Sequence, residues 1–313
     1  MEYNILGETD LRISKLSFGA SSLGSVFRPV DEDDAIGAVH TALDLGINFI
    51  DVSPYYGNTV AETVLGKALE GIDRDTYILA TKVGRYGETV FDFSATRVLD
   101  SIRESLHRLK LDHIDLIQCH DIEFGNLTQV VNETIPALNE AKSQGLVRYI
   151  GVTGYPLTVF DHVTRYAHVD SILSYCRLTL QDTSLLDIAP TMQSLGVGLI
   201  NASPLSMGLL TKRGAPSWHP ASKAIQAACR KASDYCYLHG TDIAKLALQF
   251  SVSHAEVATT LVSTASVDHI RSNVKWSEES LDMDILREVL KILTDVSGEN
   301  WPSGLPENSR YIP

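Results

Sequence analysis

The sequence predicts an α/β protein whose strands close into a (β/α)8 TIM barrel. Eight short apolar runs recur along the 313 residues, and stretches with helical periodicity alternate with them. Continuous apolar runs are typical of strands that are covered on both faces. Strand–helix alternation repeated to eight strands is typical of a closed parallel barrel. An open, doubly wound sheet is the alternative that the pattern alone leaves.

The length fits this fold as one unit, because α/β barrels often exceed ~250 residues as a single domain. We therefore expect residues 1–313 to form one barrel domain. The composition, 44% hydrophobic and 21% charged, is that of an ordinary globular protein. A net charge of −13 argues against nucleic acid or an anionic membrane as a partner.

The chain is expected to reside in the reducing cytoplasm. Its first residues lack the basic and apolar regions of a signal peptide, and its apolar runs are shorter than the ~18 residues of a spanning helix. The four cysteines form no C-x-x-C pair and are expected as reduced thiols: Cys119, Cys176, Cys229 and Cys236.

The eight candidate strands are short, β-rich and bounded by polar or glycine residues. They are residues 16–20, 48–52, 77–82, 114–118, 149–153, 171–175, 198–202 and 259–263. Helical periodicity is expected over residues 31–45, 93–110, 126–144, 156–166, 184–195, 241–253 and 267–276.

Three segments stand outside this rhythm. Residues 3–6 and 11–13 flank a Gly-Glu-Thr-Asp turn and predict a β-hairpin cap for the closed end of the barrel. Residues 203–222 are irregular and follow the seventh strand, so they are expected to clamp a cofactor on the active face. A C-terminal tail, about residues 295–313, is expected on the substrate side.

Polar side chains end three consecutive candidate strands. Asp51, Lys82 and His120 follow apolar runs, and Tyr56 lies just beyond the first of them. A buried Lys needs a partner such as Asp51, and its charge favours a tyrosine phenolate. A tyrosine tuned in this way can exchange a proton with a carbonyl or alcohol oxygen, and a neutral His can orient that oxygen. Singly, each residue also fits a cap, a solvated end or a core position.

Three segments resemble the aldo-keto reductase family. Residues 46–57 (GINFIDVSPYYG) look like its signature, in which an Asp precedes the catalytic Tyr by five positions; this offset selects Tyr56 over Tyr55. Residues 80–84 and 116–121 are similar to its Lys and His segments. The resemblance implies Tyr56 as general acid/base, Lys82 and Asp51 as its tuning pair, and His120 as the group that orients the substrate.

The resemblance also implies a nicotinamide dinucleotide across the barrel mouth, and the sequence lacks a Rossmann G-x-G-x-x-G after a strand. No metal is expected. The implied nicotinamide, pyrophosphate and adenosine contacts are Gly19, Ala20, Ser21, Thr153, Ser174, Ser203, Pro204, Leu205, Ser206, Gly208, Ser263, Thr264, His269 and Asn273. Backbone N–H groups of residues 203–208 are expected to hold the pyrophosphate.

The cofactor is expected to be NAD. Relatives that prefer NADP hold its 2′-phosphate with a Lys and an Arg, and the matching residues here are Ser263 and His269. Each lost charged hydrogen bond costs about 1.5–3 kcal/mol. Arg271 would compensate if it pointed inward. Thr153-Gly154 stands where relatives have Ser-Asn after strand five, and Leu173 or Ser174 stands where they have a Gln near strand six, so Thr153 and Ser174 are the carboxamide candidates.

Loops on the active face are rich in polar residues and poor in large apolar ones, which favours a polyol substrate. The expected substrate contacts are Tyr56, His120, Arg85, Asp121 and Glu123. Residues 116–121, 171–176 and 300–313 resemble the plant L-galactose dehydrogenase family. That resemblance implies NAD-dependent oxidation of L-galactose at C1 to L-galactono-1,4-lactone, in ascorbate biosynthesis.

Two alternatives remain at this stage. One is an NADP-dependent aldehyde or ketone reductase of the same family. The other is a catalytically silent barrel with a regulatory role, against which the intact set of four candidate catalytic residues argues. The sequence leaves a monomer and a homodimer equally open.

Overall fold

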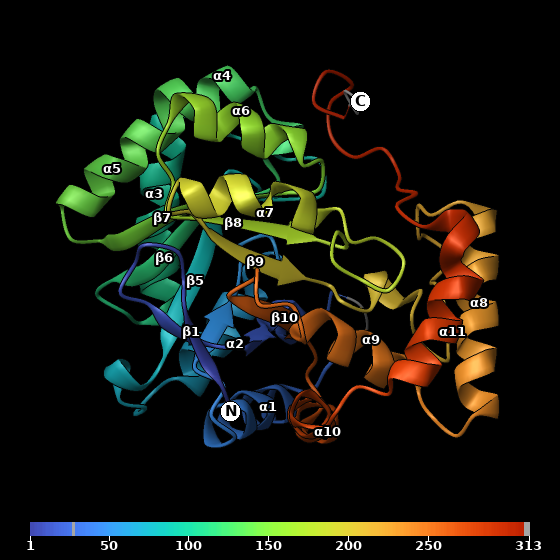
Figure 1. Ribbon diagram of the computed structural model, residues 1–313. Helices are drawn as coiled ribbons and strands as arrows, with labels where there is room; N and C mark the ends of the chain where they lie inside the picture. The colour runs from blue at the N-terminus through green and yellow to red at the C-terminus, as the bar shows by residue number, and fades with distance from the viewer. Residues whose placement is uncertain (27–28, 310–313) are drawn as a thin grey trace.

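The eight strands close into a parallel barrel, in a computed structural model that describes residues 1–26 and 29–309 (Figure 1). The order around the barrel is β10-β3-β4-β5-β6-β7-β8-β9, so the first and last barrel strands are neighbours. The open-sheet alternative is therefore excluded. The barrel strands are β3 (Leu16–Gly19), β4 (Phe49–Asp51), β5 (Ile78–Val83), β6 (Ile114–Cys119), β7 (Val147–Gly154), β8 (Ser171–Tyr175), β9 (Gly198–Ala202) and β10 (Thr259–Ser263).

A ring of helices covers the outside of the barrel, and their apolar faces pack against the outward side chains of the strands. These helices are α1 (Glu32–Asp44), α2 (Val60–Ala68), α3 (Ala95–Leu109), α4 (Leu127–Gln129), α5 (Ile135–Ser143), α6 (Thr158–Tyr166), α7 (Leu185–Ser194), α9 (Ile243–Val252) and α10 (Val267–Glu278). None of the helices in the described residues is long and apolar enough to cross a membrane.

Two further helices, α8 (Lys223–Leu238) and α11 (Met283–Leu293), pack side by side outside this ring (Figure 1). Neither was expected from the sequence, and nor was α2. The buried face of α8 consists largely of small residues such as Cys229, Ala232 and Ser233, so its apolar stripe is weak. Helix α2 follows a turn in which Thr59 has a left-handed backbone and makes no capping hydrogen bond through its side chain. The usual signal for the start of a helix is therefore missing.

The single helix expected over residues 126–144 is interrupted by a π-helical turn, Val130–Thr134, between α4 and α5. Pro136 has no N–H to donate to the carbonyl one turn earlier, which favours a widened turn there.

The hairpin of β1 (Tyr3–Ile5) and β2 (Arg12–Ser14) closes the end of the barrel where the strands begin. Leu6, Leu11 and Ile13 are buried against inward-facing side chains of six barrel strands. A side chain at Gly7 would collide with the backbone of Gly196 and Gly198, so only glycine fits this crossing. The hairpin cap expected from the sequence is thus present.

Candidate active site

A buried ion pair lies at the carboxyl ends of three adjacent strands. Lys82 in β5 is 1% exposed, and its Nζ pairs with Asp51 Oδ1 from β4 and donates to Val52 O at 2.8 Å. Gln118 in β6 donates to the other carboxylate oxygen of Asp51 at 2.7 Å. A buried charge pair is tolerated when its remaining polar atoms are hydrogen-bonded. The register places these residues together, because Asp51 lies opposite Ala80 and Lys82 opposite Gln118.

Tyr56 is partly exposed beside this pair, with its ring 4.9 Å from Lys82 Nζ. The turn after β4 holds it there, because Gly57 has a φ of +62° and packs so closely on Gly24 that a side chain would not fit. Burial raises the pKa of the Tyr56 hydroxyl to about 12, and the Lys82 charge acts in the opposite direction. The expected effect of Lys82 is therefore present, but burial outweighs it.

His120 ends β6 and faces Tyr56. Its backbone N–H donates to Val83 O at 2.8 Å, and its ring meets the Tyr56 ring edge-on at 5.7 Å. Burial, with the charges of Lys82 and Arg85, lowers the pKa of His120 to about 3, so the imidazole is neutral. The four residues predicted as catalytic thus lie together at one mouth of the barrel.

Arg85 and Asp121 form a second ion pair next to His120. Asp121 is 5% exposed; burial opposes its ionisation, but the neighbouring Arg85 guanidinium holds its pKa below the usual value. The Arg85 guanidinium stacks 3.9 Å from the centre of the Tyr55 ring. Phe91 and Phe124 also pack around this guanidinium, at 5.3 and 5.6 Å. The expectation that few large apolar side chains join this face is therefore wrong.

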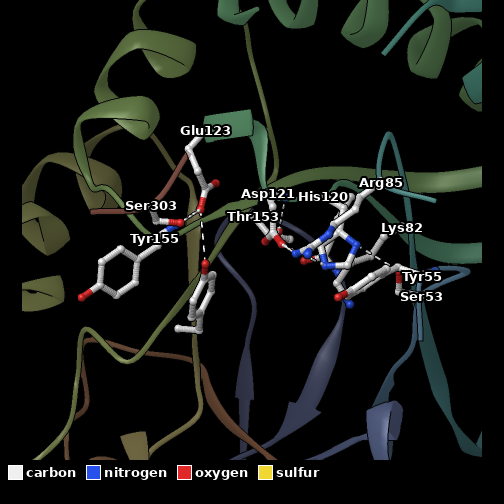
Figure 2. A network of polar contacts seen from close by, with 12 residues as sticks. Ser53, Tyr55, Lys82, Arg85, His120, Asp121, Glu123, Thr153, Tyr155 and Ser303 are labelled. Carbon is white, nitrogen blue, oxygen red and sulfur yellow. Dashed lines mark hydrogen bonds and ion pairs between the residues drawn. The ribbon is translucent and has the colours of Figure 1, made fainter. Parts of the chain in front are cut away.

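Glu123 belongs to a separate cluster, shown at the left of Figure 2. It is fully buried, and its Oε1 accepts hydrogen bonds from Tyr155 N, Tyr175 Oη and Ser303 Oγ, at 3.1–3.3 Å. Its backbone oxygen accepts from Leu305 N at 2.8 Å. Burial, followed by the Asp121 charge, raises the pKa of Glu123 to about 8. Its observed contacts anchor the C-terminal tail, so direct contact of Glu123 with substrate stays a prediction.

The tail packs on the segments that carry Glu123, Gly125 and Tyr155, and its place on the substrate side stays a prediction. Trp301 stacks on Tyr155 with ring centres 5.0 Å apart, and the backbone N–H of Trp301 donates to the Tyr155 hydroxyl. Asn308 donates to the backbone oxygens of Glu123 and Gly125, both at 2.9 Å. The end of the predicted tail, residues 310–313, lies outside the described residues.

The predicted cofactor contacts surround the same mouth, and two hydroxyls among them fit a bound polar group. Ser174 in β8 and Ser206 beyond β9 are fully buried, and their side-chain oxygens have no hydrogen-bond partner among the described residues. Buried hydroxyls without a partner are rare, and a ligand laid across the mouth would satisfy them. The residues present therefore fit a dinucleotide on this side.

Other predicted cofactor contacts have partners within the protein. Thr153 accepts from Asp121 N at 2.9 Å and lies 3.3 Å from the Asp121 carboxylate, so its hydroxyl is committed to that residue. In the clamp, the N–H groups of Ser206 and Gly208 donate to Ser203 O and Leu205 O within the loop, and binding of the pyrophosphate by this backbone stays a prediction. Ser203, Ser206 and Met207 all have positive φ angles of 47–57°, so the loop turns sharply after Pro204 and Leu205.

The predicted adenosine side lies where β10 meets β3. Ser263 pairs in register with Gly19, which precedes Ala20, and its hydroxyl bonds those of Ser21 and Ser22 at 2.7 and 2.8 Å. Thr264 and His269 contact each other at 3.3 Å at the start of α10, and Asn273 follows one turn later. Arg271 is exposed and forms no ion pair within residues 1–26 and 29–309.

Sequence reasoning missed two polar residues that support the site. Gln118 holds Asp51, and Ser53 Oγ lies 3.0 Å from His120 Nδ1. Gln118, a polar residue between Ile117 and Cys119 at the end of the predicted strand, was a readable signal. All four cysteines are free and buried, and burial raises the pKa of Cys119 to about 12.

The chain matches a protein-family model and is similar to several known proteins. The model of the aldo/keto reductase family matches residues 15–293. An L-galactose dehydrogenase from Arabidopsis thaliana is 50% identical over 98% of this chain and 99% of its own. A D-arabinose 1-dehydrogenase from Saccharomyces cerevisiae is 29% identical over 94% and 95%. The holo form of an aldo-keto reductase from Bacillus halodurans superposes with a TM-score of 0.80 at 28% identity, covering 99% of this chain and all of that one.

Proposed function

Because this chain belongs to the aldo/keto reductase family, whose members use a nicotinamide cofactor, we propose that it is an NAD-dependent sugar 1-dehydrogenase acting on L-galactose. The observation that carries the proposal is the partly exposed Tyr56 beside the buried Lys82–Asp51 pair and a neutral His120. The substrate comes from the relative that is 50% identical over nearly the full length. Its product would be the galactonolactone.

Proton transfer falls to Tyr56. The hydroxyl on C1 of the sugar would lie between the Tyr56 oxygen and the His120 ring, whose neutral form donates a hydrogen bond to it. The Tyr56 phenolate takes the hydroxyl proton as the C1–H bond breaks. Lys82 stabilises that phenolate, and Asp51 compensates the Lys82 charge in the buried site. A bound nicotinamide supplies the acceptor for the hydride that leaves C1.

The preference for NAD is supported by the side chains at the adenosine side. The hydroxyl of Ser263 is occupied by Ser21 and Ser22, and His269 contacts Thr264, so neither position carries the Lys or Arg that holds the 2′-phosphate in NADP-preferring relatives. Each missing charged hydrogen bond disfavours NADP by about 1.5–3 kcal/mol. The NADP-dependent reductase remains the competing proposal, with Arg271 as its cation.

The sugar side is supported by Arg85 and Asp121. Their ion pair presents donors and an acceptor next to His120, and the Tyr55, Phe91 and Phe124 rings wall it. Polar groups with an apolar wall suit a sugar, whose ring carries hydroxyls at its edges and C–H groups on its faces. Asp121 is the residue that we expect to accept from a sugar hydroxyl.

Initial rates of NADH or NADPH formation test the proposal, with L-galactose, D-galactose and L-fucose and each cofactor in turn. We expect fast turnover of L-galactose with NAD and little with NADP. Comparable rates with NADP would overturn the cofactor assignment and point to Arg271. Cofactor binding without turnover of any sugar would overturn the substrate and direct the search to carbonyl compounds in the reducing direction.

A further inference from the structure

We propose that Ser53 is a positioning residue that keeps the single proton of neutral His120 on Nε2, the ring nitrogen away from the Ser53 contact. The inference deepens the proposed function and rests on it for its catalytic consequence. Ser53 follows β4 two residues after Asp51, is fully buried, and lies 3.0 Å from His120 Nδ1. A hydrogen bond at one ring nitrogen decides which nitrogen carries the proton.

The hydrogen bonds of Ser53 leave one consistent arrangement. Its Oγ already accepts from the backbone N–H of Tyr55 at 3.1 Å. The hydroxyl has one proton, and among the described residues its only other side-chain partner is His120 Nδ1. If Nδ1 carried the proton, the buried Ser53 hydroxyl would be left without an acceptor. Leaving a buried donor unpaired is costly, so Ser53 donates and Nδ1 accepts.

The surroundings of His120 agree with this assignment. The ring is neutral, so it carries one proton, which must then reside on Nε2. Nε2 takes part in no hydrogen bond among the described residues, and its nearest carboxylate, Asp121 Oδ2, is 3.7 Å away. The Tyr55 and Tyr56 ring centres lie 5.9 and 5.7 Å from the imidazole and 6.0 Å from each other, so both tyrosines pack beside the ring. Nε2–H is therefore the donor available to a ligand at the mouth.

This tautomer determines the direction of proton transfer. When Nε2–H donates to the C1 hydroxyl oxygen, the proton of that hydroxyl is directed toward the other neighbour, Tyr56. In the opposite tautomer, the Nε2 lone pair would itself accept the hydroxyl proton and compete with Tyr56. Ser53 touches neither substrate nor cofactor in this scheme and acts through His120.

The test reads the tautomer directly, by long-range 1H–15N correlation on protein labelled at histidine nitrogens. The chain contains 10 histidines, and comparison with the spectrum of His120→Asn assigns the signals of His120. We expect wild-type His120 to show an unprotonated Nδ1 and a protonated Nε2. In Ser53→Ala, both tautomers should be populated, and kcat for sugar oxidation should fall about 3- to 10-fold with an unchanged KM for NAD.

Two variants control for loss of a buried serine. Ser17→Ala removes a hydroxyl that is 1% exposed and hydrogen-bonded to Thr259 at the opposite end of the barrel, and it should change neither the tautomer nor kcat. Ser53→Thr retains the donor and should restore both. If Ser53→Ala does not fold, Ser53→Cys, a weaker donor of similar size, replaces it.

The outcomes separate this inference from the proposed function. A protonated Nδ1 in the wild type, or an Nε2–H that persists unchanged in Ser53→Ala, would overturn the role of Ser53 whatever the sugar rates. An Nε2–H that is lost in Ser53→Ala supports that role. The same spectra without turnover of any sugar would still support Ser53 and would instead remove the sugar dehydrogenase proposal.

Discussion

Two buried carboxylates serve the mouth of this barrel in different surroundings. Asp51 pairs with the ammonium of Lys82 and accepts from Gln118. Glu123 has only uncharged donors at one oxygen, and its second oxygen has no partner among the described residues. We call the first group, with Tyr56 and His120, the catalytic cluster, and the second, with Tyr155, Tyr175 and Ser303, the tail anchor.

The two clusters show that a buried carboxylate with tyrosines nearby can have two different roles. In the catalytic cluster the buried Lys82 cation pairs with the Asp51 carboxylate and opposes the effect of burial on the pKa of Tyr56. In the tail anchor no cation compensates, so burial raises the pKa of Glu123 to about 8 and the acid is largely protonated near neutrality. We expect the first cluster to move protons and the second to hold the C-terminal tail.

The largest expected effect is on turnover. Tyr56→Phe removes the proposed acid/base, so kcat should fall about 10²- to 10⁴-fold while NAD still binds. Tyr155→Phe removes a matched hydroxyl from the tail anchor, where it accepts from Trp301 N, and should leave kcat within a few-fold. Initial rates and a cofactor titration measure both. Equal losses in the two variants would contradict the division into clusters.

Removing the buried cation should mainly reduce stability. Lys82→Met leaves Asp51 buried without its counter-charge, which typically costs about 3–5 kcal/mol. Urea unfolding measures the loss in free energy of unfolding. In the double variant Asp51→Asn, Lys82→Met, the charge is gone as well, so part of the loss should be recovered. A double variant less stable than Lys82→Met alone would show that the unpaired charge of Asp51 does not cause the loss of stability.

The pH dependence of sugar oxidation should reflect Tyr56 alone. Because the proposed base is the Tyr56 phenolate and burial raises the Tyr56 pKa to about 12, the ionised fraction rises about 10-fold per pH unit below that value. We expect kcat/KM to increase steadily from pH 6 to pH 10, with no limb from His120, whose pKa is about 3. A plateau with a pKa near that of free histidine would assign the base to His120. Glu123→Gln should retain the same slope.

The smallest expected effect is a pH-dependent loosening of the tail. The folded-state pKa of Glu123, about 8, lies above the usual 4.5, so the stability linked to its proton is full below about pH 4.5 and is lost as pH rises through 8. Glu123→Gln should flatten this dependence, and the exposed Glu88→Gln should not. Thermal unfolding and limited proteolysis between pH 5 and pH 9 measure it. A wild-type curve that is already flat would contradict a protonated Glu123.

Much of the barrel could be predicted because its strands are buried on both faces. All eight predicted strands lie within two residues of the observed ones at each end. Helix α8 could not be predicted from apolar periodicity, because small residues line its buried face. Helix α11 could have been: Asp282 caps it, and Leu286, Val289 and Leu293 form its buried stripe.

The four predicted catalytic residues lie together because strand ends converge in any closed parallel barrel. What the sequence could not supply was the second set of contacts. The bond between Ser53 and His120 joins residues 67 positions apart, and the partners of Glu123 come from three separate segments. Such contacts depend on loop conformations, including the left-handed Asp121 that directs the chain after β6.

The N-terminal hairpin closes one end of the barrel, so that ligands enter at the other end. Since Leu6, Leu11 and Ile13 fill the far end, sugar, lactone, dinucleotide and released proton must share the mouth above Tyr56. When two ligands enter through the same opening, the ligand that lies deeper must bind first and dissociate last. Product inhibition should therefore follow an ordered pattern, in which one of the two ligands binds first and leaves last.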